Sequence, residues 1–274
     1  MTLSLPRVVD VDAFAAAQTD PRVRLIDLSA TPVYAEQHIP GALHLEYTRL
    51  VRRAPPVLGL VPTPGDLAAI LGEAGIDPEH HVVAYDEEGG GRASRLLWTL
   101  DLVGHRGGAS LLDGGLAAWT TQGHPGEATQ HSAPLSRYPV QMHHTVEADK
   151  DYILARIGAS GTVIVDARSP AEYIGATVRA ARGGHIPGAV NVEWTEALDG
   201  SPQRRLRSLA ELVSLYTQRG VTPDKEVIVY CHSHHRSAHS YWVLTHLGFP
   251  RVRAYSGSWS EWGNDPTLPV EVST

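Results

Sequence analysis

Short apolar runs rich in β-branched residues recur along the chain and alternate with longer amphipathic stretches. The apolar runs lie at residues 25–27, 82–85, 164–166 and 227–230. A continuous run of this length is typical of a strand buried on both faces of a parallel sheet. Helical spacing of apolar positions follows at 66–75, 209–220 and 237–248. Strands that alternate with helices predict an α/β fold, with a parallel sheet covered by helices on both faces.

The same pattern occurs twice. The segment HIPGALHLEYT at 38–48 recurs as HIPGAVNVEWT at 185–195, and the segment at 114–119 matches that at 257–262. Self-similarity over such long segments indicates a duplicated structural unit. We therefore predict one domain at 1–135, a second at 147–274 and a linker at 136–146, within a stretch rich in Pro, Ser, His and Gly.

Composition narrows the class of partner. The chain has 23 Lys and Arg against 30 Asp and Glu, a formal net charge of −7, which argues against general nucleic-acid binding. The N-terminal sequence lacks a charged segment followed by a sustained apolar stretch, and no apolar run is long enough to span a membrane. We expect a cytoplasmic protein that binds neither nucleic acid nor membrane.

Cys231 is the only cysteine, which excludes intrachain disulfides and zinc sites built from several thiolates. A lone cysteine is often a small buried hydrophobe. Here, however, it directly follows the predicted strand at 227–230 and precedes the predicted helix at 237–248, which Gly248 ends. Ligands bind at this position in open α/β sheets, and a loop that closes into a helix N-terminus directs N–H groups toward an anion.

These surroundings predict that Cys231 is a nucleophile. Arg236 adds a permanent positive charge at the end of the loop. A lowering of the thiol pKa by about two units, roughly 2.7 kcal/mol, makes the group mostly thiolate near neutral pH.

The cysteine loop resembles that of a known family. The loop, the tandem repeat, the DAR strand end at 166–168, the HIPGA elements and the closing GSWSEW at 257–262 all resemble the rhodaneses. The loop is similar to the Cys-x-x-His-His-Arg-Ser form of bacterial two-domain thiosulfate:cyanide sulfurtransferases. The small Gly-Ser-Gly-Val type of loop typical of mercaptopyruvate-using relatives is absent.

The resemblance implies two tandem rhodanese-like domains and a thiosulfate sulfurtransferase. The Cys231 thiolate takes the outer sulfur of thiosulfate, releases sulfite and passes the persulfide sulfur to cyanide, a thiol or a protein acceptor. It also implies Cys231 and Arg236 as catalytic residues, with no metal and no cofactor. The implied substrate-binding residues are His232, Ser233, His234, His235 and Ser237.

The first copy carries Asp86 at the cysteine position, followed by further acidic residues and a run of glycines. A loop lined with carboxylates does not favour an anionic substrate. We interpret Asp86 as structural and the N-terminal domain as catalytically silent, in line with the usual arrangement of the family.

The sequence departs from the family pattern at one position that bears on the choice of sulfur donor. Glu172 stands where several two-domain relatives place a substrate-binding arginine, which leaves the physiological donor open. Arg179 and Arg182, in the stretch before His185, either substitute for that arginine or form a solvated basic loop.

Four alternatives are kept. The first is a 3-mercaptopyruvate sulfurtransferase, and the second is a persulfide carrier that delivers sulfur to a partner protein. A phosphatase is disfavoured because such loops enclose five residues between Cys and Arg, whereas residues 232–235 lie between them here. A metal site built from the histidines of this region is disfavoured because the loop offers no carboxylate; these are His232, His234, His235 and His239.

Overall fold

The computed structural model describes residues 5–272, and the chain forms two compact units. Unit 1 contains the chain up to Leu50, Pro62–His143 and Leu198–Leu206. Unit 2 contains Val51–Val61, His144–Ala197 and the chain from Arg207 onward. Each unit thus includes a short segment from the other half of the sequence, which the repeat alone does not predict.

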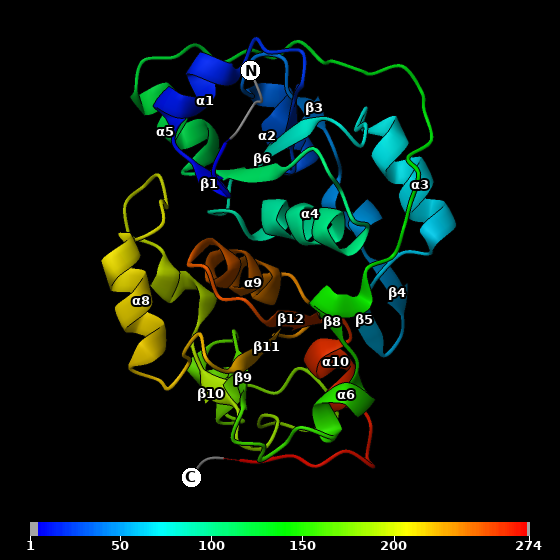
Figure 1. Cartoon of the computed structure of the whole chain (residues 1–274), viewed down its shortest axis with the longest axis vertical. Coiled ribbons are helices and arrows are strands. Elements are labelled where there is room, and N and C mark those ends of the chain that lie inside the picture. The colour runs from blue at the N-terminus through cyan, green and yellow to red at the C-terminus, as the bar shows by residue number, and fades with distance from the viewer. Residues whose placement is uncertain (1–4, 273–274) are drawn as a thin grey trace. The chain divides into compact units, whose positions relative to one another are not determined.

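Unit 1 is built on a five-stranded parallel sheet of order β1-β7-β6-β2-β3. In Figure 1, helix α4 lies on one side of strand β6, and α1, α2 and α5 lie on the other. The strands are β1 (Val8–Val9), β2 (Val23–Asp27), β3 (Leu43–His44), β6 (His81–Tyr85) and β7 (Ala109–Leu112). The helices are α1 (Val11–Ala17), α2 (Thr31–Glu36), η1 (Tyr47–Leu50), α3 (Pro64–Glu73), α4 (Gly91–Leu102) and α5 (Gly115–Thr121).

Unit 2 repeats this plan with the parallel order β10-β9-β11-β12-β8. Helix α9 lies on one side of the sheet, and α6 and α10 lie on the other (Figure 1). The strands are β8 (Glu147–Ala148), β9 (Thr162–Asp166), β10 (Val190–Asn191), β11 (Glu226–Tyr230) and β12 (Val252–Tyr255), together with the antiparallel hairpin β4 (Arg52–Ala54) and β5 (Val57–Leu60). The helices are η2 (His144–Val146), α6 (Lys150–Leu154), α7 (Pro170–Tyr173), η3 (Trp194–Ala197), α8 (Leu209–Thr217), α9 (Arg236–His246) and α10 (Ser258–Trp262).

The predicted α/β class with parallel sheets is confirmed. Helix ends differ from the predicted ones by a few residues, because capping side chains and not the apolar pattern determine where a helix begins. Helix α3 begins at Pro64 because Thr63 caps it by accepting the amide of Asp66. No helix within residues 5–272 is long and apolar enough to cross a membrane.

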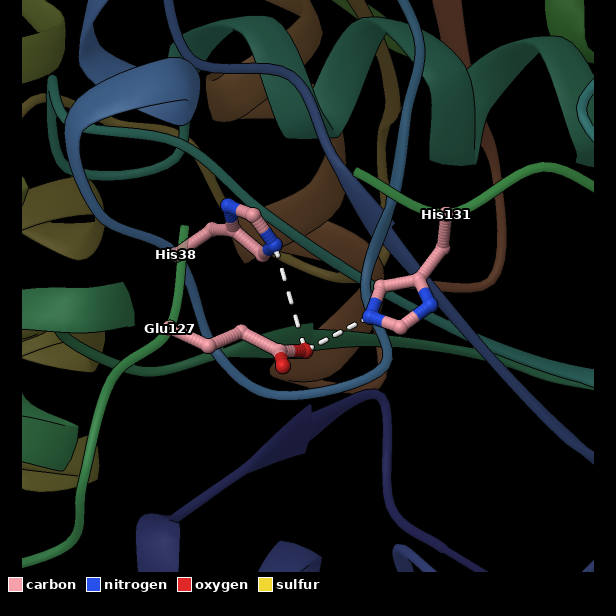
Figure 2. Close-up of side chains that lie close together, drawn as sticks. All are labelled: His38, Glu127 and His131. Carbon is pink, nitrogen blue, oxygen red and sulfur yellow. Dashed lines mark hydrogen bonds and ion pairs between the residues drawn. The ribbon is translucent and has the colours of Figure 1, made fainter. Parts of the chain in front are cut away.

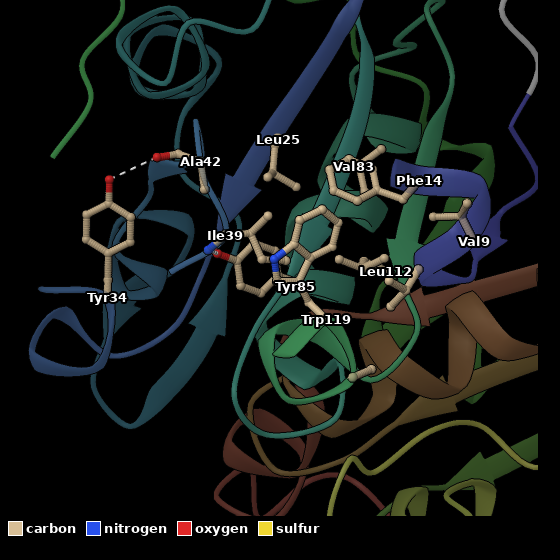
Figure 3. Packing of buried hydrophobic residues seen from close by; sticks show 12 residues of the cluster. Val9, Phe14, Leu25, Tyr34, Ile39, Ala42, Val83, Tyr85, Leu112 and Trp119 are labelled. Carbon is tan, nitrogen blue, oxygen red and sulfur yellow. Dashed lines mark hydrogen bonds between the residues drawn. The ribbon is translucent and has the colours of Figure 1, made fainter. Parts of the chain in front are cut away.

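Aromatic side chains anchor the core of unit 1, as Figure 3 shows. Phe14 and Trp119 pack edge to face with ring centroids 5.7 Å apart. Tyr85 is fully buried, and its hydroxyl accepts the backbone N–H of Ile39 at 3.0 Å. Tyr230 does the same for Ile186 at 3.1 Å in unit 2.

The repeated HIPGA segments are structural. In unit 1 the ring of His38 stacks on Tyr34 at 3.9 Å and donates from Nδ1 to the Tyr34 carbonyl. In unit 2, His185 stacks on Tyr173 at 3.7 Å and donates to its carbonyl in the same way. The motif therefore fixes the chain between a helix and the following strand, which explains why both copies keep it.

Candidate active site

Cys231 follows β11 directly and is fully buried. Its carbonyl accepts the Trp259 amide at 2.9 Å, and its own amide donates to Ser258 Oγ at 3.3 Å. Ser258 has a left-handed backbone with φ of 51°, a strained conformation for a serine. These contacts fix the cysteine backbone from the side of α10.

The thiol of Cys231 faces a set of hydrogen-bond donors. It accepts from the side chain and the backbone N–H of Ser237 and from the backbone N–H of Ser233. Burial acts to raise the pKa of the thiol, but the charge of Arg236 and these donors outweigh it, so that the pKa of Cys231 is lowered. The loop thus provides the anion-stabilising nest that the strand-loop-helix pattern predicts, with Ser237 as its main side-chain donor.

His234 forms a hydrogen bond with the Ser237 hydroxyl, the side-chain donor to the thiol. It is fully buried, and its Nδ1 lies 2.8 Å from Ser237 Oγ. Because the Ser237 hydroxyl donates to the thiolate, its oxygen accepts a hydrogen bond from His234 Nδ1, which gives a chain of hydrogen bonds from imidazole to hydroxyl to sulfur. His234 has a φ of 52°, in the left-handed region that few residues other than glycine adopt. The resemblance implies His234 as a substrate-binding residue but does not predict this contact with Ser237.

Arg236 is the first residue of α9 and forms a two-point ion pair with Glu172. Nη1 donates to Oε2 at 2.6 Å and Nη2 donates to Oε1 at 3.0 Å. Burial opposes ionisation of Glu172, yet Arg236 and Ser169 lower its pKa to about 2. Only 3% of the Glu172 side chain is exposed, so that this carboxylate partly neutralises the arginine beside the cysteine.

The two further arginines have different environments. Arg179 lies 3.3 Å from Glu172 and its side chain is 60% exposed. Arg182 instead donates to backbone carbonyls that include Leu268 at 2.8 Å and Trp262 at 2.9 Å. Arg182 is therefore neither a substitute for the substrate-binding arginine nor part of a solvated basic loop. Its hydrogen bonds hold the segment at the end of α10 and after it.

The remaining histidines of the loop region lie against an aromatic ring. Trp194 packs edge to face on His239 at 5.2 Å and lies 6.3 Å from the ring of His235. Burial, aided by His235, lowers the pKa of His239 to about 3, so its imidazole is neutral at physiological pH. Burial and then Arg236 also lower the pKa of His232. The permanent positive charge that acts on the thiol is that of Arg236.

In unit 1, the backbone amides of the corresponding loop donate to a side chain of the loop itself, that of Asp86. The buried carboxylate of Asp86 accepts the amides of Glu88, Gly90 and Ala93, each at 2.8 Å. The first of these donors lies two residues after Asp86, as Ser233 lies two residues after Cys231. The Asp86 carboxyl group thus accepts hydrogen bonds from amides that would otherwise face an external ligand.

A hairpin residue that the sequence analysis missed packs against the cysteine loop. A Cβ at Gly59 would lie 2.4 Å from the carbonyl oxygen of Ser233 and 2.5 Å from that of Ser256, so only glycine fits. Next to it, the amide of Leu58 donates to Ser260 Oγ at 3.0 Å. No local pattern pairs Gly59 with the cysteine loop, because the two are far apart in the sequence.

The Cys231 thiol is buried, has a lowered pKa and lies among hydrogen-bond donors after a parallel strand, which are the surroundings that a reactive cysteine needs. The model of the rhodanese-like domain matches residues 10–122 and 149–265. The chain belongs to the family of proteins with rhodanese-like domains, and it carries two of them.

Relatives match the chain over nearly its whole length. The chain is 44% identical over 271 residues to a thiosulfate sulfurtransferase of Pseudomonas aeruginosa, with 98% of both chains covered. It is 33% identical to the sulfur carrier protein TtuD of Thermus thermophilus, over 92% of this chain and 91% of the relative. Among solved structures, SseA from Escherichia coli, a 3-mercaptopyruvate sulfotransferase with the rhodanese fold, matches with a TM-score of 0.82 and 29% identity over 93% of this chain and 99% of that one.

Proposed function

We propose that this chain is a thiosulfate sulfurtransferase that carries sulfur as a persulfide on Cys231. The observation that carries the proposal is the Cys231 thiol, which is buried among donors that lower its pKa. The Pseudomonas relative, named for this activity, supports the choice of substrate.

The reaction has two displacements. The Cys231 thiolate attacks the outer sulfur of thiosulfate, and the sulfur–sulfur bond of the donor breaks with its electron pair leaving on sulfite. Cyanide or a thiolate then attacks the terminal sulfur of the persulfide, and the Cys231 thiolate leaves. Each half-reaction needs a stabilised thiolate, once as nucleophile and once as leaving group. No proton is exchanged with a general base when the thiolate is already formed.

The surrounding residues have separate roles in this proposal. Ser237 and the amide of Ser233 hold the negative sulfur, and His234 positions the Ser237 hydroxyl. Arg236 supplies the positive charge that draws the anionic donor, and Glu172 orients it. His232 and His235 belong to the same loop, and burial and the charge of Arg236 lower the pKa of His232, which disfavours its charged form.

Unit 1 is catalytically silent in this proposal. Asp86 occupies its own nest and accepts three amides of that loop, which are therefore not available to a substrate. Arg92, at the end of the same loop, is bound by Glu87 and Glu88 at 2.8 and 2.6 Å.

Intact-mass measurement tests the proposal. We expect wild type to gain the mass of one sulfur atom after incubation with thiosulfate, and cyanide to remove it. Cys231→Ala should show no gain. Absence of the gain on wild type would overturn the thiosulfate proposal, and 3-mercaptopyruvate and then phosphate esters would be the next donors or substrates to assay.

The Thermus relative gives a second candidate, a carrier that passes sulfur to a partner protein. Steady-state kinetics separate the two. Fast turnover with thiosulfate and cyanide supports an enzyme, whereas a stable persulfide that only a protein acceptor discharges supports a carrier. A cytoplasmic location, which would give access to cellular thiols, stays a prediction from the sequence.

A further inference from the structure

Three side chains of unit 1 that the sulfur chemistry does not use converge at the first residue of the repeated HIPGA segment, His38. Figure 2 shows His38, Glu127 and His131 directed toward one point. Glu127 Oε1 lies 3.9 Å from His38 Nε2 and 2.7 Å from His131 Nε2, and one donor atom from each residue lies within 4.8 Å of the others. His38 is fully buried, whereas the side chains of Glu127 and His131 are 26% and 35% exposed.

The hydrogen bonds of His38 prepare its Nε2 for a cation. Its Nδ1 lies 2.7 Å from the Tyr34 carbonyl, which can only accept, so this nitrogen carries a proton. Its Nε2 lies 3.0 Å from a second carbonyl, that of Thr129. In a neutral ring two lone pairs would then face each other, and a second proton or a metal ion is needed between them. A histidine whose other nitrogen donates to a carbonyl is the usual arrangement of a metal ligand.

Unit 2 provides an internal comparison. His185 Nε2 lies 3.7 Å from Glu271, and the Glu271 carboxylate accepts the amide of Gly188 at 2.8 Å. Glu127 accepts the amide of Gly41 in the same way, at 2.6 Å. The histidine and glutamate thus have a structural task in both units. Within residues 5–272, only unit 1 adds a third ligand to form a group of three.

We propose that His38, Glu127 and His131 bind a divalent transition-metal ion such as Zn²⁺, with the Thr129 carbonyl as a fourth oxygen ligand. Two imidazoles and a carboxylate are a ligand set that Zn²⁺ takes readily. Zinc bonds of 2.0–2.1 Å in a tetrahedral site separate the ligand atoms by about 3.3 Å. The observed separations of 2.7 and 3.9 Å lie on either side of this value, and rotation of the exposed His131 ring adjusts the shorter one.

The ion would tie residues 127–131, which follow the last helix of unit 1, to the loop after α2. The resemblance implies no metal, and the histidine cluster that is evident in the sequence is the one near Cys231. His131 lies in a stretch without periodicity, and His38 belongs to a motif that occurs in both copies. Only the fold brings them together.

Zinc binding to the full-length chain tests the proposal. All proteins carry Cys231→Ala, so that the thiolate does not compete, and Zn²⁺ is titrated against a chromophoric chelator. We expect one Zn²⁺ per chain, with an affinity at least about tenfold weaker in His131→Ala. The matched control is His144→Ala, an exposed histidine that also faces a glutamate, Glu147 at 3.3 Å, and it should bind like the parent.

A second variant and a second readout guard against misfolding and surface binding. Glu127→Gln keeps an acceptor for the Gly41 amide but removes the ligand charge, and it should also weaken binding. Co²⁺ should give the absorption bands of a four-coordinate site in the parent and lose them in His131→Ala. Equal Zn²⁺ affinity in the parent and His131→Ala, or no saturable binding at all, would overturn the proposal and leave the imidazole–carboxylate pair as a purely structural contact.

Discussion

The carboxylate of Glu172 binds the guanidinium of Arg236 through two hydrogen bonds of 2.6 and 3.0 Å, at the start of the helix that follows Cys231. Glu172 is the third residue of α7, and its carboxylate completes a capping box with Ser169. It therefore does two things: it caps a helix and reduces the positive charge that an anionic donor meets.

We predict that Glu172→Gln lowers the KM for thiosulfate several-fold, because Arg236 then offers an uncompensated charge to the donor. The control is Glu211→Gln, which removes the carboxylate of the other capping box, with Ser208 at the start of α8. Steady-state kinetics at low ionic strength measure both. An unchanged or higher KM in Glu172→Gln alone would mean that orientation of Arg236 matters more than its net charge.

The same ion pair predicts a dependence of stability on pH. Burial opposes ionisation of Glu172, but Arg236 and Ser169 lower its pKa from 4.5 to about 2 in the folded chain. A lowered folded pKa stabilises the fold above the ordinary pKa and loses this effect as the pH falls from about 4.5 toward 2. We expect wild type to exceed Glu172→Gln in unfolding free energy by roughly 2–3 kcal/mol near pH 6 and by much less near pH 3. Urea unfolding at both values checks this, and a constant difference would contradict it.

Ser237→Ala should raise the pKa of Cys231. The hydroxyl is the side-chain donor to the thiolate, and a hydrogen bond to a charged group is worth about 1.5–3 kcal/mol, or roughly one to two pKa units. The pH dependence of alkylation by iodoacetamide measures this pKa. Ser233→Ala is the matched control, because Ser233 contributes its backbone N–H, which the substitution keeps.

His234→Ala should move the alkylation profile in the same direction as Ser237→Ala, since it frees the hydroxyl that His234 orients. The two effects should not add in the double variant if both act through one donor. Full additivity would show that His234 acts on the sulfur by another route.

Gly59→Ala should destabilise the chain by about 1–3 kcal/mol and disturb the cysteine loop, because the new Cβ overlaps backbone oxygens of Ser233 and Ser256. Gly161→Ala is the control, since a Cβ there meets nothing within 4 Å. Thermal unfolding and turnover measure the two effects. Equal stability of the two variants would mean that the hairpin moves away from the loop at little cost.

The sequence predicts the parts of this site that depend on local order. The β-branched run at 227–230 and the helix after it place Cys231 at the end of a strand, and the repeat identifies Asp86 as its counterpart. Contacts between segments that are distant in the sequence could not be predicted in this way. The pairing of Glu172 with Arg236 and the fit of Gly59 against Ser233 depend on how strands and loops assemble. No periodicity encodes such contacts.

Asp86→Ala tests whether the loop of unit 1 is structural. The substitution leaves the buried amides of Gly90 and Ala93 without their acceptor, and we expect a loss of about 2–4 kcal/mol in unfolding free energy. The control is Asp77→Ala, which removes an exposed aspartate that accepts one amide, from Glu79. Turnover by the folded fraction should stay at the wild-type level in both variants, because Cys231 and its donors are untouched. A loss of turnover with unchanged stability in Asp86→Ala would instead assign this carboxylate a part in the reaction.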